Sequence, residues 1–245
     1  MKKEGKKKWT AVRKGSTRAR APEVSEAIPL PGHVLVLRTC HADGRPVHPD
    51  AIRTAFVWPI KVGAVVECPD WDQKPNCGNG LHGLLWGEGS TTQWLWDADA
   101  KWLVVEVLES EIVEIKDGDG PKVKFPRCRI VFCGDQRAAT SFLYDHGGAG
   151  HAIVGGTATA GTRGTATAGD AGTATAGYAG TATAGDEGTA TAGYEGTATA
   201  GYAGIIVLRW YDGKRFRIAT FYVGEDGIEP GVKYRCENGK AVKVD

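Results

Sequence analysis

The sequence predicts a mixed protein in which an α+β domain precedes a short, flattened β-solenoid. An eight-residue unit repeats between residues 156 and 204, and a short fixed period is typical of a stacked repeat architecture. Before the repeat, strand-type runs are followed by one helix-type run. The expected order is a basic arm (1–21), the α+β domain (22–147), the solenoid (148–204) and a C-terminal β-hairpin cap (205–245).

The repeat unit has the form Gly-Thr-Ala-Thr-Ala-Gly followed by two variable residues. Alternation with period two is strand-like, and β-branched threonine suits the outer face of a strand. Alanines would then line a thin interior, and glycines would supply the corners. Eight residues are too few for a closed coil with two strands, so we expect sixteen residues per coil and about three coils.

The variable position supports this longer period. Read every sixteen residues, it gives two different edges: Thr162, Tyr178, Tyr194 and Trp210 on one, Asp170, Asp186 and Tyr202 on the other. Tyr178, Tyr194 and Trp210 would stack as an aromatic ladder at the strand spacing of about 4.8 Å.

The repeat resembles the octapeptide and 16-residue repeats of bacterial ice-nucleation proteins, with their threonine rows and tyrosine ladder. The resemblance implies ice binding by the threonine rows and self-association along the tyrosine edge. Size argues against ice nucleation, because three rungs cover only about 10 Å by 7 Å. Residues 30–147 also resemble uncharacterised leader domains that precede such repeats in bacterial and phage proteins, which favours a phage or mobile-element setting.

The end of the array is visible in the sequence. Residues 205–208 (IIVL) replace the Thr-Ala-Thr-Ala pattern, and large apolar residues at these positions predict a covered rung. The cover would be two hairpins, since Asp212-Gly213 and Asn238-Gly239 suit turn positions that need a positive φ.

The α+β domain shows four strand-type segments and one helix. The helix should begin after Asp135 as N-cap and end at Gly147, with Ala138, Phe142 and Leu143 on one face. We expect it near the open end of the solenoid. The strand-type segments are 33–40, 54–68 (broken at Pro59), 101–115 and 122–134.

The arm at residues 1–21 carries a net charge of +8, and the rest of the chain carries −7. Such an arm either binds nucleic acid or another anionic partner, or is a solvated tail. The candidate anion-binding residues are Lys6, Lys7, Lys8, Arg13, Lys14, Arg18 and Arg20. Six scattered cysteines and the lack of an apolar run of about 18–20 residues favour a cytoplasmic protein with reduced thiols.

Six of the eight tryptophans lie between residues 58 and 102. Trp71, Trp86 and Trp96 could line a pocket for a small ligand, or the cluster could be the core of a small domain. Cys68, Cys77 and His82 are the candidate zinc ligands, but their spacings of nine and five match no paired Cys-x-x-Cys site. We therefore expect no bound metal.

One enzyme class stays open. Arg38 ends a buried strand, His82 lies within Gly-Leu-His-Gly, and Glu106 lies within a strand-type segment. This order loosely resembles ADP-ribosyltransferases, which implies NAD as cofactor. The Ser-Thr-Ser-like segment and the central tyrosine of that family are missing. The alternative is that Glu106 is an ordinary edge-strand residue that faces solvent.

The leading hypothesis is a non-enzymatic interaction protein without a cofactor. It would form a homo-oligomer along the Tyr178, Tyr194 and Trp210 edge and bind an anionic partner through the basic arm. An ADP-ribosyltransferase-like enzyme and a small-ligand-binding protein are the two alternatives.

Overall fold

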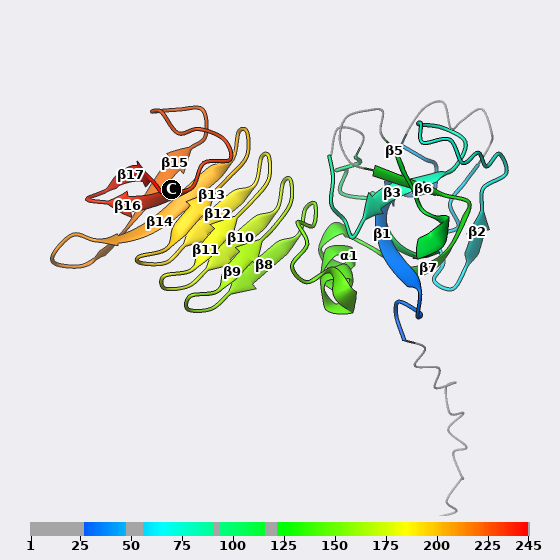
Figure 1. Ribbon diagram of the computed structural model, residues 1–245, viewed down its shortest axis with the longest axis horizontal. Coiled ribbons are helices and arrows are strands. Elements are labelled where there is room, and N and C mark those ends of the chain that lie inside the picture. Colours follow the sequence, from blue (N-terminus) through cyan, green and yellow to red (C-terminus); the bar gives the residue numbers. More distant parts are fainter. Residues whose placement is uncertain (1–26, 48–55, 91–93, 116–121, 245) are drawn as a thin grey trace, which may run out of the picture.

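The computed structural model describes residues 27–47, 56–90, 94–115 and 122–244. A strongly curved sheet lies at one end of the molecule and a β-solenoid at the other, with helix α1 between them (Figure 1). Within these residues no helix is long and apolar enough to cross a membrane. This is the predicted fold class: an α+β domain followed by a solenoid of about three 16-residue coils and a C-terminal pair of hairpins.

The α+β domain is built on a seven-stranded antiparallel sheet of order β2-β7-β4-β1-β3-β6-β5. Both faces of its central strands are buried, because β1 and β4 pack between two hydrophobic clusters. The strands are β1 (His33–Cys40), β2 (Val65–Glu67), β3 (Leu81–Leu85), β4 (Lys101–Leu108), β5 (Val113–Ile115), β6 (Lys122–Phe125) and β7 (Arg127–Gly134).

The strand-type segments at 33–40, 101–115 and 122–134 all form strands, and the second is divided by a short 3-10 turn (Glu109–Glu111). The segment at 54–68 contributes only β2 within its described part. Strand β3 was not among the predicted strand-type segments, because it is short and contains Gly83. Gly83 of β3 lies where a Cβ would be 2.5 Å from the Val36 side chain on β1, so the glycine permits close strand packing.

Helix α1 (Gln136–Leu143) follows β7 directly. The side chain of Asp135 accepts a hydrogen bond from the Ala138 N–H at 2.8 Å, as predicted for an N-cap. A π-helical turn (Tyr144–Gly148) ends it, and Gly147 there has a φ of 113°. The buried face consists of Ala139, Thr140 and Leu143, so the predicted face was wrong for Ala138, which is exposed. α1 also contacts β8, the first solenoid strand, in agreement with its predicted place.

The solenoid consists of two parallel sheets back to back. Each strand pairs in register with the strand sixteen residues further along, so Thr173 lies beside Thr157 and Thr189, and Thr181 lies beside Thr165 and Thr197. One sheet contains β8 (Thr157–Ala160), β10 (Thr173–Ala176) and β12 (Thr189–Ala192), and the other contains β9 (Thr165–Thr167), β11 (Thr181–Thr183) and β13 (Thr197–Thr199).

Alanines fill the interior and threonines face outward, as predicted. The glycines at the corners, however, serve a different purpose from the expected one. The positive φ falls on the residue before each unit's first glycine, for example 50° at Ala179 and 60° at Glu195. The glycines instead provide clearance, since a Cβ on Gly193 would lie 2.7 Å from the backbone of Gly177 in the preceding coil.

The C-terminal cap covers the last coil. Ile206 and Leu208 of β14 extend the alanine interior, and Val223, Ile228 and Tyr234 pack on them. The turn between β16 and β17 has Asn238 and Gly239 at positive φ, as predicted, whereas only Gly213 does so in the turn before β15. The cap strands are β14 (Ile205–Tyr211), β15 (Phe216–Tyr222), β16 (Tyr234–Glu237) and β17 (Lys240–Lys243).

Candidate functional site: the aromatic edge and outer face of the solenoid

One edge of the solenoid carries a short aromatic ladder. The rings of Tyr178 and Tyr194 lie in consecutive coils with their centroids 6.2 Å apart and their planes tilted by 34°. The Tyr178 hydroxyl donates a short hydrogen bond to the Glu195 carboxylate, which raises the pKa of the tyrosine. Tyr178 remains 42% exposed. The ladder is therefore ordered within the chain and accessible from outside it.

Phe216, and not Trp210, continues this ladder. The centroid of Phe216 lies 5.3 Å from that of Tyr194 in an edge-on contact. β14 continues straight past Leu208 and turns back only after Tyr211, so residue 210 never reaches the corner that the repeat register predicts. The Trp210 ring instead lies against Gly239 in the second hairpin, where a Cβ would be 3.1 Å from it. Phe216 was missed because it comes from β15, outside the repeat.

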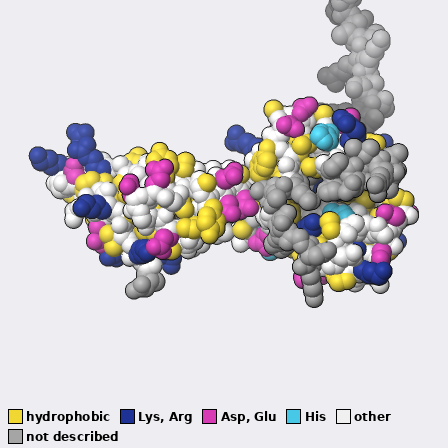
Figure 2. Space-filling model, turned by 90° about the horizontal axis from the view of Figure 1, so that it is seen from above, with side chains coloured by type: hydrophobic (Ala, Val, Ile, Leu, Met, Phe, Trp, Pro, Cys, Tyr) yellow, Lys and Arg dark blue, Asp and Glu magenta, His cyan; other side chains and the backbone are white. Residues whose placement is uncertain are grey.

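A surface hollow of about 560 Å³ adjoins the ladder on the outer face of the β8–β10–β12–β14–β15 sheet. Rings from the ladder, Val207 of β14 and Ile218 of β15 line it, and the Arg209 guanidinium lies 4.2 Å above the Phe216 ring. Figure 2 shows hydrophobic side chains along this half of the molecule and Lys and Arg side chains at its far end. The outer face thus changes from threonine rows to exposed apolar residues towards the cap.

The opposite edge uses aspartate to connect coils. The Asp170 carboxylate accepts a hydrogen bond from the Asp186 N–H at 3.0 Å, and the Asp186 carboxylate accepts one from the Tyr202 N–H at 2.8 Å. Burial raises the pKa of Asp170, and the nearby charges of Asp186 and Glu187 add to the increase. The Asp/Tyr alternation is therefore two edges with two kinds of contact between coils.

Curated relatives share this repeat. The chain is 40% identical over 113 residues, 46% of its length, to an ice nucleation protein of Pseudomonas fluorescens. It is 35% identical over 113 residues (46% of the chain) to ice nucleation protein InaU of Pantoea ananas. It is also 34% identical over 110 residues (45% of the chain) to an ice nucleation protein of Xanthomonas campestris pv. translucens.

The solenoid consists of ice-nucleation-like repeats. The chain spans only 8%, 10% and 6% of the lengths of these three relatives. No family model matches the chain, and no solved structure matches it.

Away from the ice-nucleation-like repeats, the candidate enzyme residues do not converge. Arg38 and His82 are close, since the Arg38 guanidinium donates to the His82 carbonyl at 2.9 Å. Glu106, however, pairs with Leu35, whereas Arg38 pairs with Leu103, and these two pairs belong to hydrophobic clusters on opposite faces of the sheet. One substrate cannot contact Arg38 and Glu106 through the sheet, so the ADP-ribosyltransferase-like site is not assembled.

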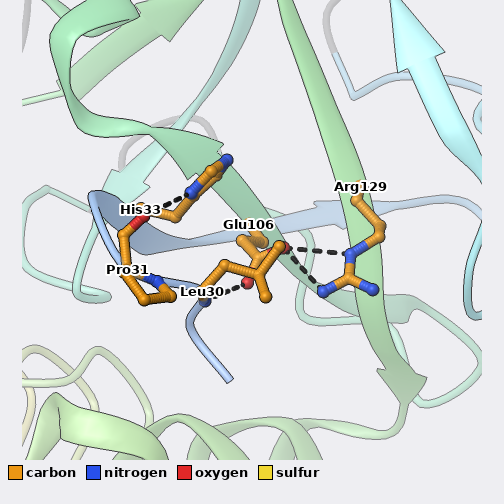
Figure 3. Close-up of polar contacts among 5 residues, drawn as sticks. All are labelled: Leu30, Pro31, His33, Glu106 and Arg129. Atoms are coloured by element: carbon orange, nitrogen blue, oxygen red, sulfur yellow. Dashed lines mark hydrogen bonds and ion pairs between the residues drawn. The ribbon is translucent and has the colours of Figure 1, made fainter. Parts of the chain in front are cut away.

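Glu106 is a buried structural anchor and does not face solvent. It is 3% exposed on β4, and its carboxylate accepts from the Leu30 N–H at 2.7 Å and the Arg129 Nε at 2.9 Å. Figure 3 shows how this carboxylate lies between the segment that leads into β1, next to Pro31 and His33, and the guanidinium on β7. A buried carboxylate paired in this way holds the start of β1 to the sheet.

Arg38 and His82 are neighbours in an apolar setting. The Arg38 guanidinium lies 4.2 Å above the Trp58 ring, and burial lowers its pKa to about 10. Burial also lowers the pKa of His82 to about 4, with the positive charges of Arg38, Lys122 and Lys124 adding to the decrease. His82 is therefore neutral at physiological pH.

The three candidate pocket tryptophans each have a different neighbour. Trp71 lies beside Lys124, Trp86 stacks on His151 with centroids 5.4 Å apart, and Trp96 contacts Trp102. Trp86 and Trp102 belong to the same hydrophobic cluster, whereas Trp71 lies beside Lys124. The ligand pocket stays a prediction.

The candidate zinc ligands also lie apart. Cys68 donates to Asp70, Cys77 accepts from Lys122, and no group of three or more His, Cys, Asp or Glu side chains within the described ranges could hold a metal ion. The basic arm (1–21) lies outside the described residues.

Proposed function

We propose that this chain is a non-enzymatic assembly protein that self-associates through the aromatic edge of its solenoid. The observation that supports this most directly is the ladder of Tyr178, Tyr194 and Phe216 beside an apolar hollow. A self-associating surface is typically an exposed apolar patch with rigid aromatic side chains, because such rings bury much area at a small entropic cost.

The ladder has the features of an interface. Its rings are pre-ordered by tilted and edge-on contacts with one another and, at Tyr178, by the hydrogen bond to Glu195. Little side-chain entropy would therefore be lost on association. A solenoid edge is also straight and periodic, so a second ladder can lie against it in the same spacing. The ice nucleation proteins share the repeats that build this edge.

Light scattering coupled to size-exclusion chromatography tests the proposal. The mass measured for wild type should be a multiple of the 26.0 kDa of one chain, and Tyr178→Ser/Tyr194→Ser should reduce that measured mass. Tyr202→Ser is the matched control, because Tyr202 is 69% exposed on the other edge and should change nothing. A single-chain mass for wild type at every concentration would rule the proposal out.

A second candidate function is contact with ice. The rows of threonines are in register on both sheets, which is a regular array of hydroxyl and methyl groups at about 4.8 Å intervals along the stack. The relatives are named for ice nucleation, and lateral assembly would widen the small array of one chain. Droplet-freezing temperatures with and without Thr175→Lys test this, and equal temperatures for both proteins and for buffer would exclude it.

The anionic partner of the basic arm belongs to the same proposal and is supported by the +8 charge of residues 1–21. Binding of the chain to DNA should weaken steeply with salt and disappear on removal of residues 1–21. DNA binding that survives this truncation would exclude the arm as the binding segment. The cytoplasmic location and the phage setting stay predictions.

A further inference from the structure

Strand β15 ends one solenoid sheet, in the order β15-β14-β12-β10-β8. An edge strand presents unpaired backbone groups that can pair with another chain. Its side chains are accessible, since Ile218 is 73% exposed and Phe216 and Tyr222 are about half exposed. An uncovered apolar edge of this kind is unusual in natural sheets, because edges are normally blunted by charge or by a cover.

The hydrogen bonds at both ends of the β14–β15 hairpin show which backbone groups point outward. The Asp212 N–H donates to the Arg215 carbonyl, and the Val223 N–H donates to the Gly204 carbonyl. Antiparallel pairs alternate between hydrogen-bonded and non-hydrogen-bonded, so Arg217, Ala219 and Phe221 bond to β14 in the register observed. The N–H and C=O groups that face away from the sheet are those of Phe216, Ile218, Thr220 and Tyr222. The Tyr222 carbonyl already accepts a hydrogen bond from the Glu225 N–H at 3.1 Å in the turn after β15.

The other edges of the two solenoid sheets differ from β15. The first coil is bridged to the preceding segment, because the Gly169 N–H donates to the Ile153 carbonyl and the Gly155 N–H to the Asp170 carbonyl. β17 carries a lysine at each end, Lys240 and Lys243, which in an antiparallel self-pairing would face each other. β15 carries one charged side chain, Arg217, and its guanidinium is already bound by Asp212 at 2.6 Å.

We propose that β15 pairs with β15 of a second copy of this chain, antiparallel and about a two-fold axis at Ala219. In this register Ile218 faces Thr220 and Phe216 faces Tyr222 of the other copy. The outward backbone groups of Ile218 and Thr220 meet in hydrogen-bonded pairs at the centre, and the Tyr222 N–H faces the Phe216 carbonyl at each end. Aromatic cross-strand pairs then close both ends of the contact. The strand is thus self-complementary in backbone groups, side chains and charge.

This contact joins two solenoids end to end, whereas the aromatic edge joins them side by side. It rests on the proposed function only in that the chain assembles with itself. Because the axis is two-fold, the contact closes with two copies. The two contacts meet at Phe216 and Ile218, which border the aromatic edge. They otherwise differ, because the side-by-side contact uses the rings of Tyr178 and Tyr194 and the end-to-end contact uses the backbone edge of β15. A chain with both contacts extends into a larger assembly.

Charge substitutions at residues 218 and 220 test the register. They are made in the full chain with Tyr178→Ser/Tyr194→Ser, which removes the side-by-side contact. Ile218→Lys with Thr220→Lys puts like charges opposite each other and should halve the mass from two chains to one. Ile218→Lys with Thr220→Glu puts Lys opposite Glu twice and should restore the two-chain mass. The second variant also controls for folding and for the loss of Ile218.

Each outcome decides between the two contacts. A two-chain mass for the Lys/Lys variant, or a one-chain mass for both variants, overturns the pairing of β15. The pairing of β15 is also overturned if the Tyr178→Ser/Tyr194→Ser protein is already a single chain while wild type assembles. In that case the proposed function stands without the pairing. A two-chain mass that responds only to the charges at 218 and 220 supports the pairing.

Discussion

The α+β domain and the solenoid are stabilised in different ways. The first buries large and varied side chains, among them Trp58, Trp102 and Phe125. The second buries alanines almost exclusively until Ile206 and Leu208 begin the cap. An alanine buries little apolar area, so the solenoid depends more on hydrogen bonds between coils and on their close approach at the glycine corners.

Because of this difference, the stability of the two halves should respond to opposite kinds of substitution. Removing volume should damage the α+β domain, and adding volume should damage the solenoid. The halves can be followed separately, because tryptophan fluorescence is dominated by the six residues between 58 and 102. Far-ultraviolet circular dichroism also senses the solenoid strands.

The largest expected effect is the loss of a core ring from the α+β domain. Phe125→Ala removes a side chain with no exposed area and should lower the free energy of unfolding by about 3–5 kcal/mol. Urea unfolding followed by tryptophan fluorescence measures it. Ala182→Gly in the solenoid interior should cost only about 1 kcal/mol, and equal losses in the two halves would contradict the comparison.

Acid should destabilise the α+β domain through His82. The folded pKa of about 4 lies below the ordinary 6.5, so the unfolded state binds a proton first as the pH falls. Stability is therefore lost between about pH 6.5 and 4, by up to about 3 kcal/mol. Urea midpoints at pH 7 and 4.5 should differ less for His82→Gln than for wild type. An unchanged difference would show that His82 is not the group responsible.

The next largest effect is expected where a side chain is added at a solenoid corner that is occupied by glycine. Gly193→Ala brings a Cβ to 2.7 Å from the Gly177 backbone and should cost about 1–3 kcal/mol. Gly161 occupies the same position in the first coil, where a Cβ meets nothing within 4 Å. Gly161→Ala should leave the thermal midpoint unchanged. If both variants melt alike, stacking between coils is not the reason for these glycines.

The smallest expected effect comes from Asp170, whose contribution to stability changes with pH in the opposite direction from that of His82. The folded pKa of Asp170 is raised, so its favourable contribution is present at low pH and is lost as the pH rises through that pKa. Asp170→Asn keeps the oxygen that accepts from Asp186 and removes the charge. It should stabilise the solenoid at pH 7 by about 0.5 kcal/mol, because solvent screens part of the charge at this half-buried position. A lower thermal midpoint for the variant at pH 7 would contradict this.

Local patterns predicted much of the fold but not its long-range pairings. The sixteen-residue coil and its two edges follow from strict repetition, because each coil repeats the contacts of the one before. Strand β1 and the Asp135 cap follow from runs of adjacent residues. The separation of Arg38 from Glu106 could not be predicted, since it depends on the register between β1 and β4. The replacement of Trp210 by Phe216 likewise depends on where a hairpin turns.

The in-register pairing of nearly identical coils has a consequence for how this gene can change length. Deletion of one eight-residue unit from the array would exchange the sheets and edges of everything that follows. β14 would then meet the wrong sheet, and the aspartate and tyrosine rows would be broken. Deletion or duplication of sixteen residues leaves every row continuous and alters only the distance between the α1 end and the cap. Copy-number variation in such an array is therefore tolerated in pairs of units.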